Sequence, residues 1–326
     1  MAASPLYGQD GSSDTDLPAD YRFGLDVAAV HLAATVVDKK GRLVTDLDEG
    51  DFVVYEDGVP QDLTYFSRGT DAPVDVMLLV DGSGSMDMAS KVANARNAAI
   101  QLVSVLGAED RIAVYAFARE IVELCSFTED KKEAIGALQR LEPFGSTAIY
   151  DAVAKASDLI RHQGFGRRAI VLITDGIDTA SELSVEQAVE VAKGVDLPVY
   201  AIRVLSPLDD PESDSFVGVH GRDAMLVDSL ERFAAETGGK LYEASELGAL
   251  RLASFRVKDE LKTQYRLGYV PRNSRQDGRF RRIEVYIRLE NVQVRTRKGY
   301  YARAAKRGAG ESNTRAVPVQ DPQFNR

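Results

Sequence analysis

Several features that common protein classes require are scarce or missing in this chain. It has one cysteine, Cys125, so no disulfide can form within the chain, and the apolar residues around it favour a small core side chain. No stretch is long and apolar enough to span a bilayer. The N-terminus lacks the charged leader and apolar core of a signal peptide, which leaves open a cytoplasmic protein or a mature exported form.

A net positive charge is also missing. The formal net charge is -10 and the pI is about 5.0. This argues against a general binder of nucleic acid or of anionic membranes, because both need a basic field. Basic residues do cluster late in the chain, and we interpret them as outward positions on β-strands. The cluster comprises Arg279, Arg281, Arg282, Arg295, Arg297 and Lys298.

The hydrophobic pattern divides the chain, whose 326 residues suffice for two cores, into three parts. Residues 25–37, 51–56 and 63–66 read as strands, with Asp57-Gly58 as a tight hairpin turn between the last two. The middle part alternates strands at 74–80, 111–118, 121–127, 168–174 and 198–204 with helices at 89–106, 131–141, 148–161, 185–194, 227–237 and 247–262. Strands return at 264–270, 283–289 and 292–297, with Glu290-Asn291 as a tight turn.

Strands that alternate with helices predict an α/β fold, with a doubly wound, mostly parallel sheet covered by helices on both faces. The strands at 111–118 and 121–127 are too close for a helical crossover and should form an antiparallel hairpin at one edge. The outer strands are marginal alone, so we expect them to close a small all-β sandwich into which the α/β unit is inserted. The predicted division is a disordered lead-in at 1–21, sandwich at 22–70, the α/β unit at 71–263, sandwich at 264–303 and a flexible tail at 304–326.

The most informative segment is 81–86, which reads Asp-Gly-Ser-Gly-Ser-Met and directly follows the apolar run 76–80. Alternate residues of an extended segment point the same way, so Asp81, Ser83 and Ser85 can converge on one point. Oxygen donors with no histidine or cysteine nearby suit a hard cation such as Mg²⁺, Ca²⁺ or Mn²⁺.

Two later loops carry matching groups. Thr147 follows Gly145-Ser146 and precedes a predicted helix, and Asp175 follows the apolar strand 168–174. Open α/β sheets bind ligands at the carboxyl ends of their strands, so we expect the three loops to meet there. The candidate metal site comprises Asp81, Ser83, Ser85, Thr147 and Asp175.

An Asp-x-Ser-x-Ser loop, an isolated threonine and a strand-terminal Thr-Asp-Gly, in this order, resemble the metal-ion-dependent adhesion site of von Willebrand factor type A domains. The resemblance implies that Ser83 and Ser85 coordinate the cation through their hydroxyls and that Thr147 does so directly or through water. It implies that Asp81 and Asp175 act mostly through waters. One coordination position would stay open for an Asp or Glu of a protein partner, so the expected function is metal-bridged binding without chemistry. Mg²⁺ suits such a site best because it keeps several waters.

A wider resemblance covers about residues 24–302. The segments 44–47, 51–61, 265–269 and 297–301 include Val-Thr-Asp-Leu, Tyr-Glu-Asp-Gly-Val-Pro-Gln, Tyr-Arg-Leu-Gly-Tyr and Arg-Lys-Gly-Tyr-Tyr. They are similar to a subfamily of bacterial von Willebrand factor A-related proteins that is abundant in Acidobacteria. Its members usually carry export signals, which implies an extracytoplasmic site in the periplasm, on the cell surface or outside the cell. The alternative within the family is an intracellular adaptor for an AAA+ ATPase.

Enzymatic interpretations fit less well. The chain has no Gly-Lys-Ser/Thr phosphate loop, and the segment 82–84 lacks the third glycine of a dinucleotide fingerprint. A serine hydrolase would need a base, and His31, His162 and His220 have no reason to meet Ser83. A metal-dependent phosphohydrolase that uses Asp81 would want a second carboxylate in the loop, where Ser83 stands. We therefore expect no enzymatic activity, while a metal site surviving as a relic on a structural domain is the remaining alternative.

Three further carboxylates flank the predicted site. We interpret Asp87 and Asp178 as loop carboxylates or groups at a helix N-terminus rather than ligands. Asp151, one helical turn after Thr147, is expected to support the loop. The acidic segment 206–225 emerges at the same rim, and we expect either a mobile loop or a lid that contributes to specificity.

Overall fold

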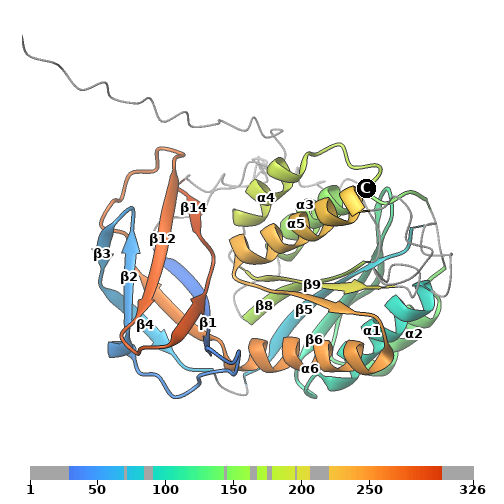
Figure 1. The fold of residues 1–326 in the computed structure, drawn as a ribbon, viewed down its shortest axis with the longest axis horizontal. Helices are drawn as coiled ribbons and strands as arrows, with labels where there is room; N and C mark the ends of the chain where they lie inside the picture. Colours follow the sequence, from blue (N-terminus) through green and yellow to red (C-terminus); the bar gives the residue numbers. More distant parts are fainter. Residues whose placement is uncertain are drawn as a thin grey trace, which may run out of the picture.

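The computed structural model describes residues 29–69, 72–83, 91–142, 145–161, 167–174, 178–194, 197–205 and 220–302. The predicted lead-in at 1–21, the predicted tail at 304–326 and most of the acidic segment 206–225 lie outside these residues. A β-sandwich and a larger α/β unit stand side by side in Figure 1. Helix α6 (Leu247–Thr263) runs along the base of the α/β unit and leads into the sandwich.

A six-stranded sheet forms the centre of the α/β unit, in the order β10-β9-β8-β5-β6-β7. Its strands are β5 (Val74–Asp81), β6 (Arg111–Phe117), β7 (Ile121–Thr128), β8 (Arg167–Thr174), β9 (Val199–Val204) and β10 (Leu241–Ala244). All neighbours are parallel except β6 and β7, which form an antiparallel hairpin at one edge. The predicted sheet and its predicted edge hairpin are confirmed. The central strands are apolar throughout because both faces of the sheet are buried.

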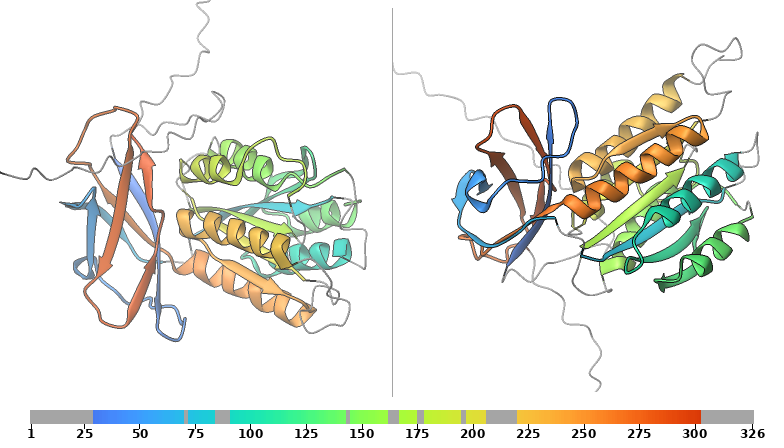
Figure 2. Two further views of the ribbon diagram at one scale, coloured as in Figure 1. Left: turned by 45° about the horizontal axis from the view of Figure 1, so that its top comes forward. Right: turned by 90° about the horizontal axis from the view of Figure 1, so that it is seen from below.

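Helices cover both faces of this sheet, as Figure 2 shows. The helices α1 (Lys91–Val105), α2 (Lys131–Gln139) and α6 share a core with one face, and α3 (Ile149–Arg161), α4 (Val185–Lys193) and α5 (His220–Thr237) share a core with the other. Successive residues of β5 alternate between the two cores, so Leu78 lies in the first and Leu79 in the second. The doubly wound architecture is therefore confirmed.

The position of β5 makes its carboxyl end the natural place for a ligand. β5 lies between β6 and β8. The chain reaches β6 through α1 on one face of the sheet and reaches β8 through α3 on the opposite face. Open α/β sheets bind ligands at such a reversal, at the carboxyl ends of the strands. Asp81 is the last residue of β5.

The sandwich combines strands from both ends of the described chain, as predicted. Its two antiparallel sheets have the orders β13-β1-β11-β4 and β14-β12-β2-β3. Leu32, Val54, Leu267 and Ile283 share its single core. The elements are β1 (Val30–Asp38), a 3-10 turn η2 (Glu49–Asp51), β2 (Phe52–Glu56), β3 (Val59–Gln61), β4 (Leu63–Ser67), β11 (Tyr265–Tyr269), β12 (Phe280–Ile287), β13 (Val292–Arg295) and β14 (Gly299–Tyr301).

Both tight turns occur, but the first joins a different pair of strands than predicted. Asp57 and Gly58 have φ values of 48° and 75° and join β2 to β3, a short strand that the sequence pattern missed. The predicted partner β4 instead pairs with β11 in the opposite sheet. Asn291, with φ of 64°, joins β12 to β13 as predicted, although the two strands lie in different sheets. The dipeptides indicate a turn correctly, but they do not indicate whether the chain stays in one sheet.

The interpretation of the late basic cluster is wrong for two of its members. Arg281 and Arg297 are buried, with 5% and 3% of their surface exposed. Arg281 donates to Asp277, and Arg297 donates to the carbonyl oxygen of His31. Arg295 forms an ion pair with Glu260. Because these guanidinium groups are bound within the protein, the cluster is not a continuous basic face.

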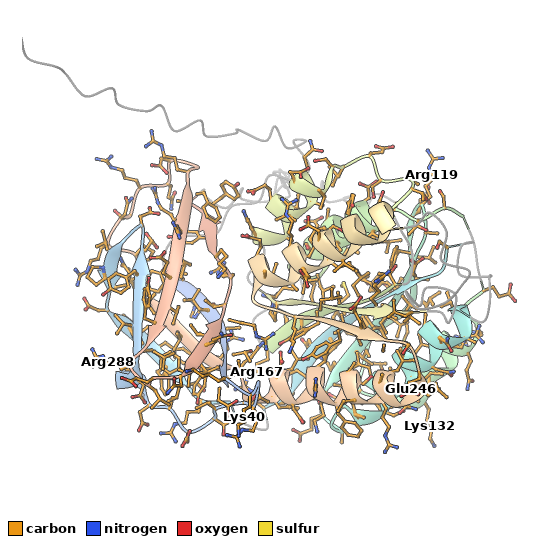
Figure 3. The ribbon with its side chains drawn as sticks, viewed as in Figure 1. Lys40, Arg119, Lys132, Arg167, Glu246 and Arg288 are labelled. Carbon is orange, nitrogen blue, oxygen red and sulfur yellow. The ribbon has the colours of Figure 1, made fainter. Side chains whose placement is uncertain are left out.

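Polar contacts join the sandwich to the α/β unit. Arg167, at the junction in Figure 3, donates to the carbonyl oxygens of Lys262 and Arg68 at 2.9 and 3.1 Å. Arg295 of the sandwich pairs with Glu260 of α6 at 2.7 Å. Since Arg167 begins β8 and Lys262 lies in the last turn of α6, the junction ties the central sheet to the segment that enters β11. None of the described helices combines the length and apolar character needed to cross a membrane.

Candidate metal site

Asp81 is the buried anchor of the candidate site. Asp81 has no exposed surface, and it stands at the carboxyl end of the central strand β5. Its Oδ1 accepts a hydrogen bond from the backbone N–H of Ser83 at 2.9 Å, and its Oδ2 accepts one from the Thr174 hydroxyl at 2.6 Å. The first bond bends the loop after β5, and the second joins that loop to the end of β8. A buried carboxylate is costly unless such partners compensate it.

The end of β6 brings the Thr147 loop to the Asp81 loop. The backbone N–H of Gly82 donates to the carbonyl oxygen of Phe117 at 2.8 Å, and the N–H of Ala148 donates to that of Ala118 at 2.9 Å. These consecutive carbonyl groups hold one residue from each loop. Gly145 takes a φ of 66°, and a Cβ there would stand 3.2 Å from the Ala118 side chain, so glycine suits this turn.

The predicted ligands can now be placed. Asp81, Ser83 and Thr147 lie at the same edge of the sheet, with at most 2% of each residue exposed. Ser85 and Asp175 lie outside the described residues. Sequence reasoning missed the role of Thr174, although the strand-terminal Thr-Asp-Gly was part of the predicted pattern. The signal was present, since a hydroxyl residue that ends a strand beside β5 can reach the carboxylate that ends β5.

A second set of contacts locks the Thr147 loop to the segment that follows Asp175. The Thr147 carbonyl oxygen accepts from the N–H groups of Thr179 and Ala180 at 2.8 and 3.0 Å. The Thr147 N–H donates to the Thr179 hydroxyl at 3.2 Å. These backbone contacts hold residue 147 in place from both of its peptide groups.

Asp178 extends this lock to the start of α3. Its Oδ2 accepts from the backbone N–H groups of Ile149 and Tyr150 at 2.7 and 3.2 Å and from the Ser181 hydroxyl at 2.5 Å. Its Oδ1 accepts from the Ser181 N–H at 3.1 Å. The first N–H groups of a helix have no partners within the helix, and a carboxylate satisfies them while complementing the helix dipole. The interpretation of Asp178 as a carboxylate at a helix N-terminus is confirmed.

Asp151 completes the connection. Its two carboxylate oxygens accept from the N–H groups of Glu182 and Leu183 at 2.9 and 3.0 Å. Asp151 therefore supports the loop, as expected from its spacing to Thr147. We call residues 147–151 together with 178–183 the loop clamp. Asp87, the other flanking carboxylate, lies outside the described residues.

The donor set at this edge is rich in hydroxyls and poor in carboxylates. In the described part of the chain, no group of three or more His, Cys, Asp or Glu side chains could hold a metal. Asp81 contributes a carboxylate, and Ser83 and Thr147 contribute hydroxyls, which are oxygen donors that a hard divalent cation accepts. A site of this composition leaves a cation short of negative charge.

Residues 76–177 match the family model of the von Willebrand factor type A domain. The match begins within β5 and extends past Thr174, so it contains the three loops of the candidate site. It supports a von Willebrand factor type A domain in this part of the chain. No curated protein matches the sequence.

Several solved structures resemble the chain at a distance. The conserved hypothetical protein BatB from Bacteroides thetaiotaomicron is 20% identical over 58% of this chain and 100% of that chain, with a TM-score of 0.46. A von Willebrand factor type A protein from Catenulispora acidiphila is 13% identical over 88% of this chain and 73% of that chain, with a TM-score of 0.46. Proximal thread matrix protein 1 from the mussel byssus, described with a zinc-occupied MIDAS motif, is 17% identical over 61% of this chain and 49% of that chain, with a TM-score of 0.48.

Proposed function

We propose that this chain is a divalent-cation-dependent binding protein whose metal recruits an acidic residue of a protein partner. One observation carries the proposal: Asp81 is wholly buried at the reversal point of the sheet, and the hydroxyl residues Ser83 and Thr147 stand on adjoining loops. The proposed ligand set adds Ser85 and Asp175. A carboxylate and neutral hydroxyls suit Mg²⁺ best, and Ca²⁺ or Mn²⁺ as alternatives.

The residues of the proposed metal site have different roles. The proposed roles of Ser83 and Thr147 are to offer hydroxyl oxygens, and Asp81 orients the first loop through the Ser83 N–H. When bound, the cation supplies an open coordination position and an excess of positive charge that a partner's carboxylate satisfies. The loop clamp holds Thr147 through its backbone, so a carboxylate that approaches this edge meets positioned groups rather than a loop that must first be ordered.

Binding without catalysis is part of the proposal. Hydrolysis by an activated serine needs a base within hydrogen-bond reach. His31, the histidine whose side chain the structure describes, lies in the sandwich strand β1, with its ring 6.2 Å from that of Tyr65. No described carboxylate other than Asp81 belongs to the proposed ligand set.

We further propose, from the family resemblance, an adhesive or assembly role outside the cytoplasm, and detection of the protein in the periplasmic or secreted fraction would test this location.

The decisive experiment is a titration of Mg²⁺, Ca²⁺ and Mn²⁺ by calorimetry into the chelated full-length chain. We expect saturable binding to the wild type and no detectable binding to a double variant with Asp81→Ala and Ser83→Ala. Asp46→Ala is the matched control, because Asp46 is an exposed carboxylate in the sandwich. No binding to the wild type, or equal binding to the double variant, would overturn the proposal. Circular dichroism of each variant shows whether the fold is retained.

Thr174 offers a milder test of the same site. Replacing Thr174 with valine keeps the shape but removes the hydroxyl that donates to Asp81. We expect the cation affinity to fall about tenfold, because groups that orient metal-site carboxylates typically contribute ten- to a hundredfold. Thr174→Ser keeps a hydroxyl and should restore most of the affinity. If valine and serine variants bind the cation equally well, the bond between Thr174 and Asp81 does not position the site.

A further inference from the structure

The chain crosses between the sandwich and the α/β unit twice, and the two crossings touch each other. The first follows β4 and contains Gly69, and the second ends α6 and contains Thr263. A Cβ added to Gly69 would stand 2.4 Å from the Cα of Thr263 and 2.6 Å from its carbonyl oxygen, which is closer than Cβ atoms approach other atoms in proteins. The two backbones are therefore in direct contact, at a separation that glycine alone permits.

Two side chains tie the crossings together. Arg167, which begins β8, donates to the carbonyl oxygen of Arg68 in the first crossing and to that of Lys262 in the second. The Lys262 ammonium group in turn donates to the carbonyl oxygen of Ala72, which also belongs to the first crossing, at 3.2 Å. We call residues 68–69, 72–73 and 262–264 the neck. Its two chain segments are held to each other by these bonds as well as by their backbone contact.

A buried carboxylate anchors the neck to the central sheet. Asp110 has no exposed surface, and its Oδ1 accepts from Lys262 at 2.5 Å and from the N–H of Val74, the first residue of β5, at 3.0 Å. Its Oδ2 accepts from the Gly107 N–H at 2.6 Å. Burial opposes the charge of Asp110, but these bonds outweigh burial and lower its pKa. The neck is therefore bonded to the strand that carries Asp81 at its other end.

The sandwich needs chain segments from both sides of the neck. Strands β1 and β4 pair with β11, and β2 pairs with β12, so each sheet joins a segment before the first crossing to one after the second. Residues 70–262 lie between Gly69 and Thr263. Unfolded, they would form a long loop whose closure costs conformational entropy. Folded, they deliver both segments to the sandwich already in contact, so folding of the α/β unit removes this cost.

The sandwich in turn completes the α/β unit. Glu260 of α6 is buried, and it pairs with Arg295 of β13 at 2.7 Å and accepts from the Tyr242 hydroxyl at 2.8 Å. Arg295 also donates to the carbonyl oxygen of Gly239 at 3.0 Å. If the sandwich opened alone, Glu260 would lose this guanidinium group. A buried carboxylate that loses its counter-charge is strongly destabilising, so opening of the sandwich weakens α6 as well.

We propose that the neck couples the two cores into one cooperative unit, so that whatever stabilises or destabilises one core has the same effect on the other. The coupling involves no change of shape, because each core supports the folded state of its neighbour. One consequence rests on the proposed function. A cation bound beside Asp81, at the end of β5 opposite to the neck, stabilises the sandwich core although it does not touch it.

Amide hydrogen exchange of the full-length chain measures the opening of each core separately. The slowest amides of β6 and β8 report on the α/β unit, and those of β1 and β11 report on the sandwich. Leu78→Ala removes a wholly buried side chain from the α/β unit and should speed exchange in both sets by the same factor, about thirtyfold or more. Mg²⁺ at a hundred times its dissociation constant should slow both sets about a hundredfold. Faster exchange in the α/β unit alone for Leu78→Ala would overturn the coupling.

Gly69→Ala tests the neck itself. The added Cβ collides with the backbone of Thr263 and must push the two crossings apart. In this background the effect of Leu78→Ala on the sandwich should fall to at most about a third of its effect on the α/β unit. Gly50→Ala is the matched control, because Gly50 lies in the η2 turn of the sandwich and a Cβ there would meet nothing within 4 Å. It should leave the two responses equal.

Arg167→Met provides a second test that keeps the backbone contact. It removes the bonds to both crossings and should also make the response of the sandwich smaller than that of the α/β unit. Its control is Arg111→Met, because Arg111 begins the neighbouring strand β6 and pairs with Asp75 within the α/β unit. The Arg111→Met chain should keep equal responses. If Gly69→Ala does not fold, Arg167→Met decides.

The outcomes separate this inference from the proposed function. If Mg²⁺ binds but slows exchange in the α/β unit alone, the coupling is overturned and the cation site is upheld. If Mg²⁺ does not bind, the proposed function fails, and Leu78→Ala still decides whether the cores are coupled. Equal responses that survive in folded Gly69→Ala and in Arg167→Met would show that the coupling does not pass through the neck, which overturns the assignment.

Discussion

Replacing Asp178 with alanine is expected to lower the free energy of unfolding by about 3 kcal/mol and to weaken cation binding about tenfold. The carboxylate accepts hydrogen bonds from the start of α3 and from Ser181, and bonds to a charged group are worth about 1.5 to 3 kcal/mol each. Alanine leaves the donors of Ile149 and Ser181 without this acceptor, while the Tyr150 N–H keeps its bond to the Ser181 hydroxyl oxygen, and it removes a negative charge from a helix N-terminus. Because the same change loosens the loop clamp, Thr147 loses its fixed position. Urea unfolding and calorimetric Mg²⁺ titration measure the two effects.

The controls for this prediction come from the same segment. Glu182 belongs to the clamp through its backbone N–H, but its exposed carboxylate makes no hydrogen bond within the described residues, so Glu182→Ala should change stability by less than about 0.5 kcal/mol. Asp178→Asn keeps the shape and one acceptor oxygen but loses the charge, and it should fall between wild type and alanine. A destabilised Asp178→Ala protein with unchanged Mg²⁺ affinity would show that the clamp supports the fold without positioning the site.

The α/β unit was the more predictable part of the molecule, for a physical reason. Strands such as β5 and β8 are buried on both faces, so they appear as uninterrupted apolar runs. Polar residues that end such runs must gather at one edge of a parallel sheet, which is why Asp81 could be assigned to a ligand site before any geometry was known. Thr147 precedes a helix, and it was assigned to the same site because its loop completes the family pattern. The short edge strand β10 was missed because its four residues are too few to show a pattern.

The contacts that position the site were less predictable. Asp178 and Asp151 were recognised only as supporting carboxylates, because their partners are backbone N–H groups about 30 residues away. The amino-acid sequence does not indicate which backbone N–H groups a carboxylate contacts. In the sandwich, turn dipeptides marked the bends but not the sheet to which the next strand belongs. That choice depends on which face of each strand is buried, and strands of three to five residues carry too little alternation to decide it.

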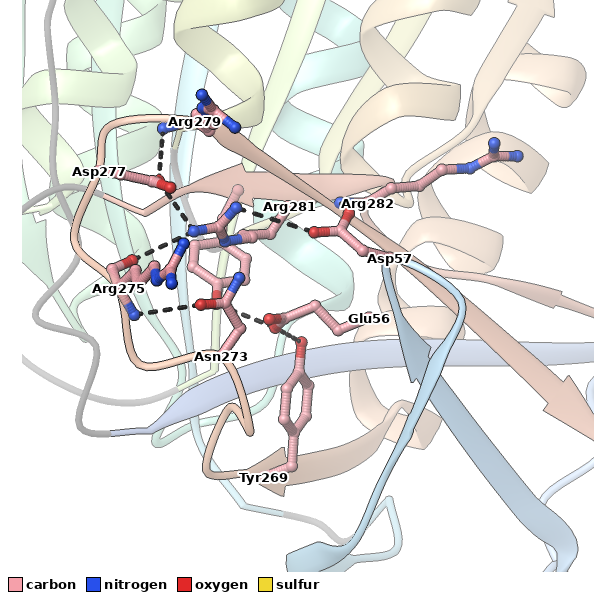
Figure 4. Close-up of polar contacts among 10 residues, drawn as sticks. Glu56, Asp57, Tyr269, Asn273, Arg275, Asp277, Arg279, Arg281 and Arg282 are labelled. Carbon is pink, nitrogen blue, oxygen red and sulfur yellow. Dashed lines mark hydrogen bonds and ion pairs between the residues drawn. The ribbon is translucent and has the colours of Figure 1, made fainter.

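One buried cluster explains why separate segments of the sandwich carry recognisable sequence patterns. Glu56 of β2, Tyr269 of β11 and Tyr300 of β14 belong to three segments of the wider family resemblance, and they meet in the core. Figure 4 shows Glu56 beside the hydroxyl of Tyr269. Both tyrosine hydroxyls donate to Glu56 Oε2, at 2.8 and 3.0 Å. Only 2% of Glu56 is exposed. The cluster ties strands from both ends of the described chain to one carboxylate.

Replacing Glu56 with alanine should therefore lower the free energy of unfolding by about 3 kcal/mol, since it leaves two buried hydroxyls without their acceptor and opens a cavity. The tyrosines stay protonated donors, because burial and the nearby carboxylate raise the pKa of both Tyr269 and Tyr300. Tyr269→Phe and Tyr300→Phe each remove one donor and should cost about 1 to 2 kcal/mol. Urea unfolding measures all three variants, and a loss below about 1 kcal/mol for Glu56→Ala would contradict this account of the cluster.

The pH dependence of Glu56→Gln isolates the charge of the cluster. Burial raises the pKa of Glu56 above its ordinary value of 4.5, although the bonds from Tyr269 and Tyr300 oppose the shift. Between 4.5 and the raised value the folded chain binds more protons at this group than the unfolded chain, so stability falls as pH rises. Glutamine does not titrate. The stability of Glu56→Gln relative to wild type should therefore increase above pH 4.5 and level off beyond the folded-state pKa. If the difference in stability between Glu56→Gln and wild type stays constant across this range, the hydrogen bonds from the two tyrosines stabilise the charged carboxylate as much as burial destabilises it. The charge of Glu56 would then make no net contribution to the stability of the fold.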